Sequence, residues 1–161
     1  MRIEYINPFI VAVTQVFESS VGITPHRSSV GIKQKNTPSH DVSAIIGLSG
    51  NAFGSVVLSF PRETAEQVMS KMLGDEDVSS EFIADGVGEL ANMIAGVAKT
   101  ILAEDGVKTF ISIPRVVLGL NHYIHRPKEV PCVAVYFSSE MGDIALEVAL
   151  KVLQEVPAGP A

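Results

Sequence analysis

Residues 42–60 have the sequence VSAIIGLSGNAFGSVVLSF, which carries a clear pattern of two strands. Apolar side chains occupy every second position of its first half, namely Val42, Ala44 and Ile46. The pair Gly50-Asn51 then favours a tight turn, and residues 53–60 form a second run rich in β-branched and apolar residues. Two such runs joined by a short Gly-Asn turn predict an antiparallel β-hairpin.

Helix signals lie on both sides of this hairpin. Before it, Asn7 and Pro8 predict a helix start, with Asn7 as the N-cap and Pro8 at the first helical position. Apolar residues then recur at helical spacing as far as Gly22. After the hairpin, residues 61–73 predict a second helix that ends at Gly74, and residues 79–104 predict a longer third helix.

The other apolar segments are short and predict strands, at residues 28–34, 110–113, 116–118, 132–137 and 144–150. The order of elements (helix, strands, two helices, strands) predicts an α+β fold. We expect one mostly antiparallel sheet covered by helices, with an internal pseudo-repeat of helix plus strands. We expect residues 1–156 to form a single domain and residues 157–161 to be a frayed tail.

Composition excludes several functional classes. The formal net charge is -6 and the pI is about 5.1, so nucleic acid and anionic membranes are not expected partners. A single cysteine, Cys132, cannot form an internal disulfide and fits a reducing compartment. The first apolar stretch is too short to span a bilayer and has no cleavage signal, so we expect a cytoplasmic protein.

Candidate functional residues lie on the third helix. At 100° per residue, Val87, Leu90 and Ile94 fall on one side, as a core stripe, together with Val97, Ala98 and Ile101. The opposite side carries Asp85, Glu89, Asn92, Gly96 and Lys99. Glu89 and Asn92 are therefore expected one turn apart and pointing outward.

Small residues border this polar stripe, where a solvated helix usually carries long side chains. Three of them are glycines, Gly86, Gly88 and Gly96, and each costs about 1 kcal/mol relative to alanine inside a helix. One interpretation is tight packing on a neighbouring element. The other is close approach of a partner's backbone along Glu89 and Asn92. The residues alone leave both open.

A longer pattern surrounds these two residues. Asp85, Glu89 and Asn92 have the spacing D-x-x-x-E-x-x-N, and Pro114 follows some twenty residues later. With the opening YINPFI, residues 5–10, and the phrase GELANMIAG, residues 88–96, this pattern resembles the CheC/CheX/FliY family of phosphatases, and its CheX branch in particular. Size and element order agree with that family over nearly the whole chain.

The resemblance implies a function and a site. It implies a chemotaxis phosphatase that hydrolyses the aspartyl phosphate of a CheY-type response regulator, with Glu89 and Asn92 as the catalytic pair. Glu89 would pair with the regulator's active-site lysine, and Asn92 would orient the attacking water. Asp85, Gly88, Gly96 and Lys99 are the candidate docking residues. Mg²⁺ would come from the phosphorylated partner, with no cofactor held by this chain.

Three alternatives accompany this interpretation. Glu4 and Asn7 also have E-x-x-N spacing, but Pro8 disfavours helical geometry at Asn7, so only one site is expected. A zinc site built from His122 and His125, with Cys132 and His26 or His40, is not expected, because no paired-cysteine motif supports it. The alternative function is a non-catalytic module that binds a response regulator or a flagellar switch component.

The resemblance also implies a homodimer formed by joining sheets. Proline cannot donate a hydrogen bond to a central ladder, so the strands around Pro114 are expected near a sheet edge. The region expected near the edge also includes residues 123–127, which follow these strands. A two-fold pairing here would cover the edge and leave Glu89 and Asn92 free.

Overall fold

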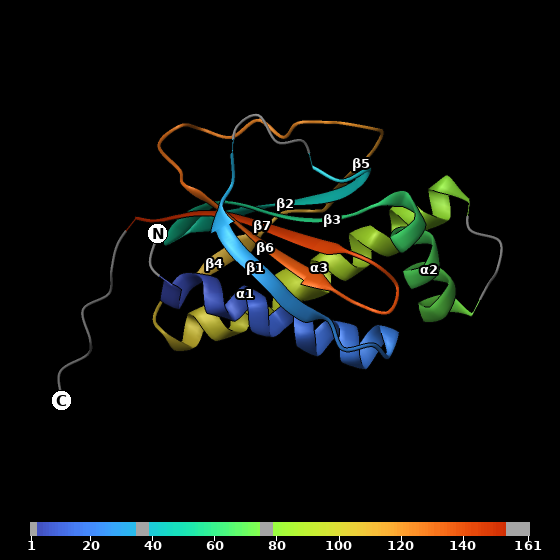
Figure 1. Cartoon of the computed structure of the whole chain (residues 1–161). Coiled ribbons are helices and arrows are strands. Elements are labelled where there is room, and N and C mark those ends of the chain that lie inside the picture. Colours follow the sequence, from blue (N-terminus) through green and yellow to red (C-terminus); the bar gives the residue numbers. More distant parts are fainter. Residues whose placement is uncertain (1–2, 35–38, 75–78, 154–161) are drawn as a thin grey trace.

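One antiparallel sheet with helices on one of its faces makes up the described part of the chain (Figure 1). The computed structural model describes residues 3–34, 39–74 and 79–153. The helices are α1 (Ile3–Val16), the short π-helix η1 (Phe17–Val21), α2 (Arg62–Leu73) and α3 (Ser80–Glu104). The strands are β1 (His26–Ile32), β2 (Val42–Gly50), β3 (Ala52–Phe60), β4 (Thr109–Ile111), β5 (Arg115–Leu118), β6 (Cys132–Ser138) and β7 (Ile144–Val152).

The order of strands in the sheet confirms the predicted pseudo-repeat. The order is β1-β6-β7-β3-β2-β4, and β5 also pairs with β2. The first half of the chain gives α1 followed by β1, β2 and β3, and the second half gives α3 followed by β4 and β5, β6 and β7. The last strands of the two halves, β3 and β7, meet in the centre, while β1 and the β4–β5 segment lie at opposite edges. The α+β prediction is confirmed.

The hairpin of residues 42–60 forms as predicted. Val42 pairs with Phe60 and Leu48 with Gly54 across β2 and β3, in continuous antiparallel register. Gly54 is required by a close approach, because a Cβ there would overlap the carbonyl of Ala149 on β7. The hairpin thereby places β3 directly against β7 in the centre of the sheet.

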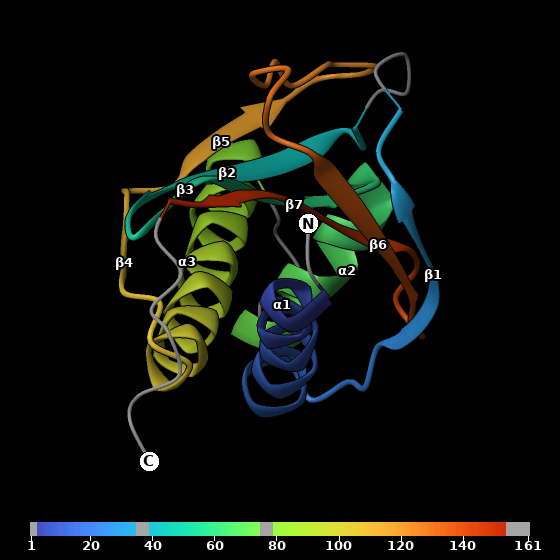
Figure 2. The ribbon, with the colours of Figure 1, turned by 90° about the vertical axis from the view of Figure 1, so that its left-hand side faces the viewer.

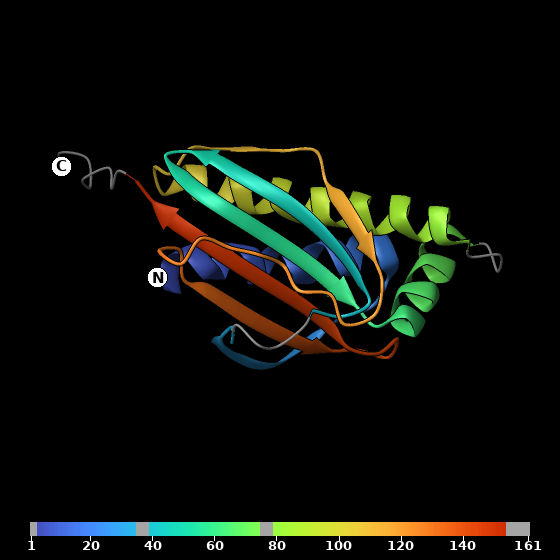
Figure 3. The ribbon, with the colours of Figure 1, turned by 90° about the horizontal axis from the view of Figure 1, so that it is seen from above.

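The sheet curves around the helices, which all lie on its inner side (Figure 2). Seen from above, α1 and α3 run below the sheet and α2 closes one end (Figure 3). Large side chains fill the space between the layers, and the Phe17 ring packs against that of Phe60 in a tilted arrangement, with ring centroids 6.1 Å apart. The chain between β5 and β6, residues 119–131, crosses the outer face of the sheet.

The predicted start of the first helix is wrong. The helix begins at Ile3, and Pro8 lies inside it, so Asn7 is a helical residue with an exposed side chain and not an N-cap. The physical reason is burial: Ile6 is only 3% exposed and Tyr5 packs against the core, so apolar contacts extend the helix past the proline. A proline this near the helix start removes one backbone hydrogen bond, which these contacts offset. The predicted end at Gly22 is confirmed by its left-handed conformation, φ 83°.

Pro114 lies at a sheet edge, as predicted. β4 and β5 both pair with β2 and have no strand beyond them among the described residues. Residues 112–114 interrupt the pairing between the two strands. The predicted frayed tail, residues 157–161, lies outside the described residues, as does the end of the predicted domain at residue 156.

No helix among the described residues combines the length and the apolar character needed to cross a bilayer.

Candidate functional site

Helix α3 carries the candidate site and is held from three directions. Ser79 caps it: its side-chain oxygen accepts a hydrogen bond from the backbone N–H of Phe82, at 3.2 Å. The helix packs against α1, against α2 and against the sheet. Its buried residues are Ile83, Gly86, Val87, Gly88, Leu90, Ala91, Ile94, Ala95, Ala98 and Leu102. This burial leaves one narrow outward face.

The predicted site residues lie on that face. Glu89 is exposed and Asn92 is half-buried, one helical turn further along. Asp85 is exposed a turn before Glu89, whereas Gly96 and Lys99 are half-buried in the two turns after Asn92. The structure therefore presents a carboxylate and a carboxamide side by side on a helix surface.

The edge segment around Pro114 lies along the same side of α3. A Cβ at Gly88 would meet Pro114 and Val116 at 3.6 and 3.4 Å, and Lys99 Nζ lies 5.7 Å from the ring centroid of Phe110. Asn92 lies on the helix between these two contacts. The separate parts of the sequence pattern thus meet in space, and Phe110 and Ile113 remain 65% and 87% exposed nearby.

The three glycines of α3 have different surroundings. At Gly86 a Cβ would overlap the sulfur of Met69 on α2, so this glycine permits tight helix packing. Gly88 is buried against Pro114 and Val116, which gives it a packing role, and a docking role for it stays a prediction. At Gly96 no described residue outside the helix's own backbone lies within 4 Å of a Cβ. Close approach of a partner's backbone is therefore open at Gly96.

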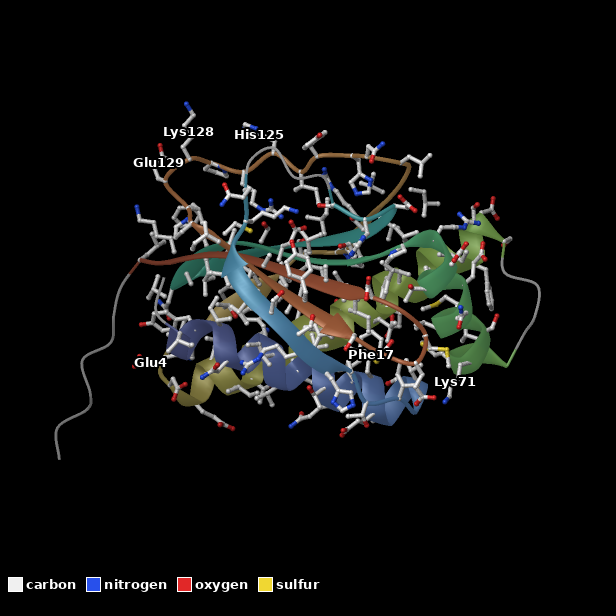
Figure 4. All side chains as sticks on the ribbon, in the orientation of Figure 1. Glu4, Phe17, Lys71, His125, Lys128 and Glu129 are labelled. Carbon is white, nitrogen blue, oxygen red and sulfur yellow. The ribbon has the colours of Figure 1, made fainter. Side chains whose placement is uncertain are left out.

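The second E-x-x-N pair does lie on a helix, contrary to the expectation from Pro8. Glu4 and Asn7 both belong to α1, one turn apart, and both side chains are exposed. Glu4 is visible at the end of α1 (Figure 4). The expectation that these two residues do not stack is wrong, for the reason given for α1. The single catalytic pair predicted for this chain stays a prediction.

His122, His125 and Cys132 do not gather as a set of metal ligands. His122 is tied to its surroundings, with Nε2 2.7 Å from Ser43 Oγ and Nδ1 2.8 Å from the carbonyl of Gly119. His125 is exposed, and Cys132 is buried on β6. Within the described ranges no three His, Cys, Asp or Glu residues are grouped to hold a metal. The expectation that this chain holds no metal stays a prediction.

Sequence reasoning missed a buried ionic cluster on the outer face of the sheet. Glu147 on β7 is 1% exposed, and its carboxylate lies 2.9 Å from Lys33 Nζ and 3.4 Å from Arg126 Nη2. Ser39 Oγ donates a hydrogen bond to it at 3.0 Å. The available signal was a carboxylate between Leu146 and Val148 in a mostly apolar strand, because buried carboxylates need charged partners.

The chemistry open to Glu89 and Asn92 is positioning. A carboxylate accepts hydrogen bonds or pairs with a cation, and a carboxamide both donates and accepts. On α3, neither Glu89 nor Asn92 is a nucleophile paired with a general base. A carboxamide is too weakly basic to abstract a proton but can hold a water in place. Such a pair fits a substrate that another molecule presents to the helix surface.

Comparison with known proteins identifies the family of this chain. The family model described as "Chemotaxis phosphatase CheX" matches residues 42–138, which include Glu89, Asn92 and Pro114. The CheY-P phosphatase CheX of Thermotoga maritima is 31% identical over 121 residues, which are 74% of this chain and 78% of that protein.

Solved structures show the same fold. CheX from Desulfovibrio desulfuricans matches with a TM-score of 0.84 and 32% identity, over 92% of this chain and 99% of that one. CheX from Borrelia burgdorferi, in a complex with CheY, BeF3 and Mg²⁺, matches with a TM-score of 0.79 and 29% identity, over 93% of this chain and 99% of that one. The chain belongs to the CheX family of chemotaxis phosphatases.

Proposed function

We propose that this chain ends a chemotaxis signal by hydrolysing the aspartyl phosphate of a CheY-type response regulator. Family membership makes it a phosphatase, and its relatives from Thermotoga maritima and Borrelia burgdorferi are named for phosphorylated CheY or found in complex with CheY. The observation that carries the proposal is the pairing of Glu89 with Asn92 on the exposed face of α3, beside the edge segment around Pro114.

In the proposed mechanism α3 docks on the receiver's phosphorylated aspartate. The Glu89 carboxylate pairs with a lysine of the receiver and fixes the register of docking. The Asn92 carboxamide reaches the phosphoryl group and holds a water for in-line attack on phosphorus. Mg²⁺ bound by the receiver supplies charge neutralisation for the phosphoryl oxygens. An aspartyl phosphate has a good leaving group, so orienting the water is the main contribution left to this chain.

The docking surface proposed here extends from Asp85 to Lys99. Asp85 and Gly96 would approach the receiver on either side of the catalytic pair, because both lie on the outward face of α3. Lys99 adds a positive charge at the far end, where its ammonium group also lies near the Phe110 ring. Small or short side chains along this face would let the receiver approach α3 closely.

Turnover separates catalysis from the alternative of a non-catalytic binding module. A CheY-type receiver is phosphorylated with radioactive acetyl phosphate, freed of excess donor, and mixed with this protein at a small fraction of the receiver concentration. A catalyst clears many receivers per chain, so nearly all label should be lost. A binder would alter at most the fraction of label equal to its own concentration, and that result would contradict the proposal.

We propose in addition that the chain works as a cytoplasmic homodimer. Apolar side chains are exposed at the end of β5 and just after it, at Leu118, Leu120 and Tyr123. Pairing through this edge would cover them and leave Glu89 free on each subunit. Light scattering at micromolar concentration tests the assembly, since a mass near that of one 17.2 kDa chain contradicts it.

A further inference from the structure

The outer face of the sheet, opposite the helices, holds a second concentration of charge. Glu147 lies under the chain segment 119–131, with Lys33 Nζ at 2.9 Å and Arg126 Nη2 at 3.4 Å. All three side chains are largely shielded from water, with exposed fractions of 2%, 8% and 12%. Two cations therefore share one carboxylate in a place where charge is expensive to bury.

Arg126 is not fully satisfied by this arrangement. Its Nε and Nη2 atoms are out of contact with solvent, and they make no hydrogen bond within the part of the chain that the structure describes. The 3.4 Å separation from Glu147 is an ion pair and not a well-formed hydrogen bond. The guanidinium group is planar, and its fork of N–H donors matches the two oxygens of a carboxylate or phosphate.

A cavity adjoins this cluster. It has a volume of about 430 Å³, within the usual range for small-molecule sites, and both Lys33 and Arg126 line it. His125 and Lys128 add two further basic side chains from the covering segment, where they lie above the sheet (Figure 4). The rest of the wall is mostly apolar, from Ile32, Tyr123, Ile124, Pro127, Val130 and Pro131.

Charge and shape together define what such a cavity accepts. The whole chain has a net charge of -6, yet the described residues that line this cavity include Lys33, Arg126 and Lys128 and no carboxylate. An anion in the cavity would be attracted by the basic side chains that line it. The apolar wall would bury an aromatic or aliphatic body attached to that anion.

We propose that this cavity binds a small organic anion, a phosphate or carboxylate on an apolar body, with Arg126 and Lys33 holding the anionic group. It lies on the face of the sheet away from α3, so it is separate from the proposed phosphatase site. The ligand would fix the segment 119–131 to the sheet.

Phenyl phosphate serves as the probe, and NMR of the full chain as the readout. Millimolar phenyl phosphate should shift the resonances of the residues that line the cavity. Phenol has the same body without charge and should bind at least about tenfold more weakly. Inorganic phosphate, which lacks the body, should also bind more weakly. Phenyl phosphate that shifts none of the lining residues overturns the proposal.

Two shape-conserving variants give effects of opposite sign. Arg126→Lys keeps the charge beside Glu147 but loses the fork, so affinity should fall about tenfold. Glu147→Gln removes the competing carboxylate and should raise affinity several-fold. Glu140→Gln makes the same charge change in an exposed turn at another site and should leave affinity unchanged. Equal affinities for wild type, Arg126→Lys and Glu147→Gln would rule out the cavity as the binding site.

Cys132 gives a local readout, because it is the sole cysteine and lines the same cavity. Burial raises its pKa to about 11, while Arg126 acts in the opposite direction, so its thiol reacts slowly at neutral pH. Phenyl phosphate should slow its alkylation further in wild type and less in Arg126→Lys. An alkylation rate that saturating phenyl phosphate leaves unchanged would contradict binding beside Cys132.

Discussion

Replacing Gly96 by alanine separates docking from folding. The structure shows open space at this residue, because none of the residues that it describes, apart from the helix's own backbone, lies within 4 Å of an added Cβ. Gly96 is in the interior of α3, where alanine is more stable than glycine by about 1 kcal/mol. We therefore expect Gly96→Ala to raise the melting temperature by about 2–4 °C. The added methyl group would stand on the surface that we propose for receiver docking.

The same change should weaken catalysis. If the receiver's backbone approaches Gly96 closely, the methyl group must be accommodated at the interface, and we expect about a tenfold loss in catalytic efficiency on the phosphorylated receiver. Thermal unfolding and single-turnover dephosphorylation measure the two effects on one preparation. A more stable variant with the wild-type rate would refute close approach at Gly96.

Gly88→Ala is the matched comparison on the same helix. Its Cβ would contact Val116 and Pro114 at 3.4 and 3.6 Å, in ordinary van der Waals contact, and would not point to the surface. We expect it to keep the wild-type rate per folded molecule. A selective loss of rate in Gly88→Ala would favour a docking role for that residue as well.

Three further predictions concern α1, pH and metal. Asn7→Ala should leave the free energy of unfolding unchanged or raise it by about 0.5 kcal/mol, since Asn7 is inside the helix and alanine is the better helix former. A loss of about 1 kcal/mol, measured by denaturant unfolding, would instead indicate that Asn7 is an N-cap. Burial lowers the pKa of His40 from 6.5, against the opposing effect of Asp143, so the unfolded chain binds more protons at this residue than the folded chain does. The stability that this difference contributes should be complete above pH 6.5 and should fall as the pH drops towards the folded pKa. His40→Gln should reduce that dependence of stability on pH in unfolding curves. Protein purified without added metal should contain none at a stoichiometric level by elemental analysis, and one equivalent of zinc would contradict the assignment of Mg²⁺ to the partner.

Local patterns predicted most of the elements because those patterns coincide with burial. The alternation in residues 42–46, the Gly50-Asn51 turn and the long helix of residues 79–104 all formed within a few residues of their predicted positions. Pro114 was placed at an edge on the strength of its missing N–H alone. These features depend on neighbours in sequence, so the sequence alone carries them.

The start of α1 could not be predicted from local rules. Residues that precede a proline tend to avoid helical geometry, but this preference is local. The burial of Ile6 and Phe9 against elements distant in sequence overrides it. The Glu147 cluster escaped notice for the same reason. Its partners Lys33 and Arg126 are distant from it in sequence. The pairing of β1 with β6 places Lys33 near β7, and the crossing of residues 119–131 over the sheet places Arg126 there.

The candidate site was predictable in part. Helical periodicity placed Glu89 and Asn92 on one outward face, which the structure confirms. The glycines were not separable by sequence, because packing and docking demand the same small residue. Only the positions of Met69 beside Gly86 and of Pro114 beside Gly88 distinguish them from the open position of Gly96.

The central claim is that Asn92 on α3 promotes hydrolysis of the receiver's aspartyl phosphate. The most direct test is the rate of label loss from a phosphorylated CheY-type receiver with saturating wild type, with Asn92→Ala, and with Glu104→Ala at the exposed far end of the same helix. We predict acceleration by wild type and Glu104→Ala, and loss of at least about a hundredfold of that acceleration in Asn92→Ala, which still folds and binds. Asn92→Ala that clears the label at the wild-type rate would contradict the account.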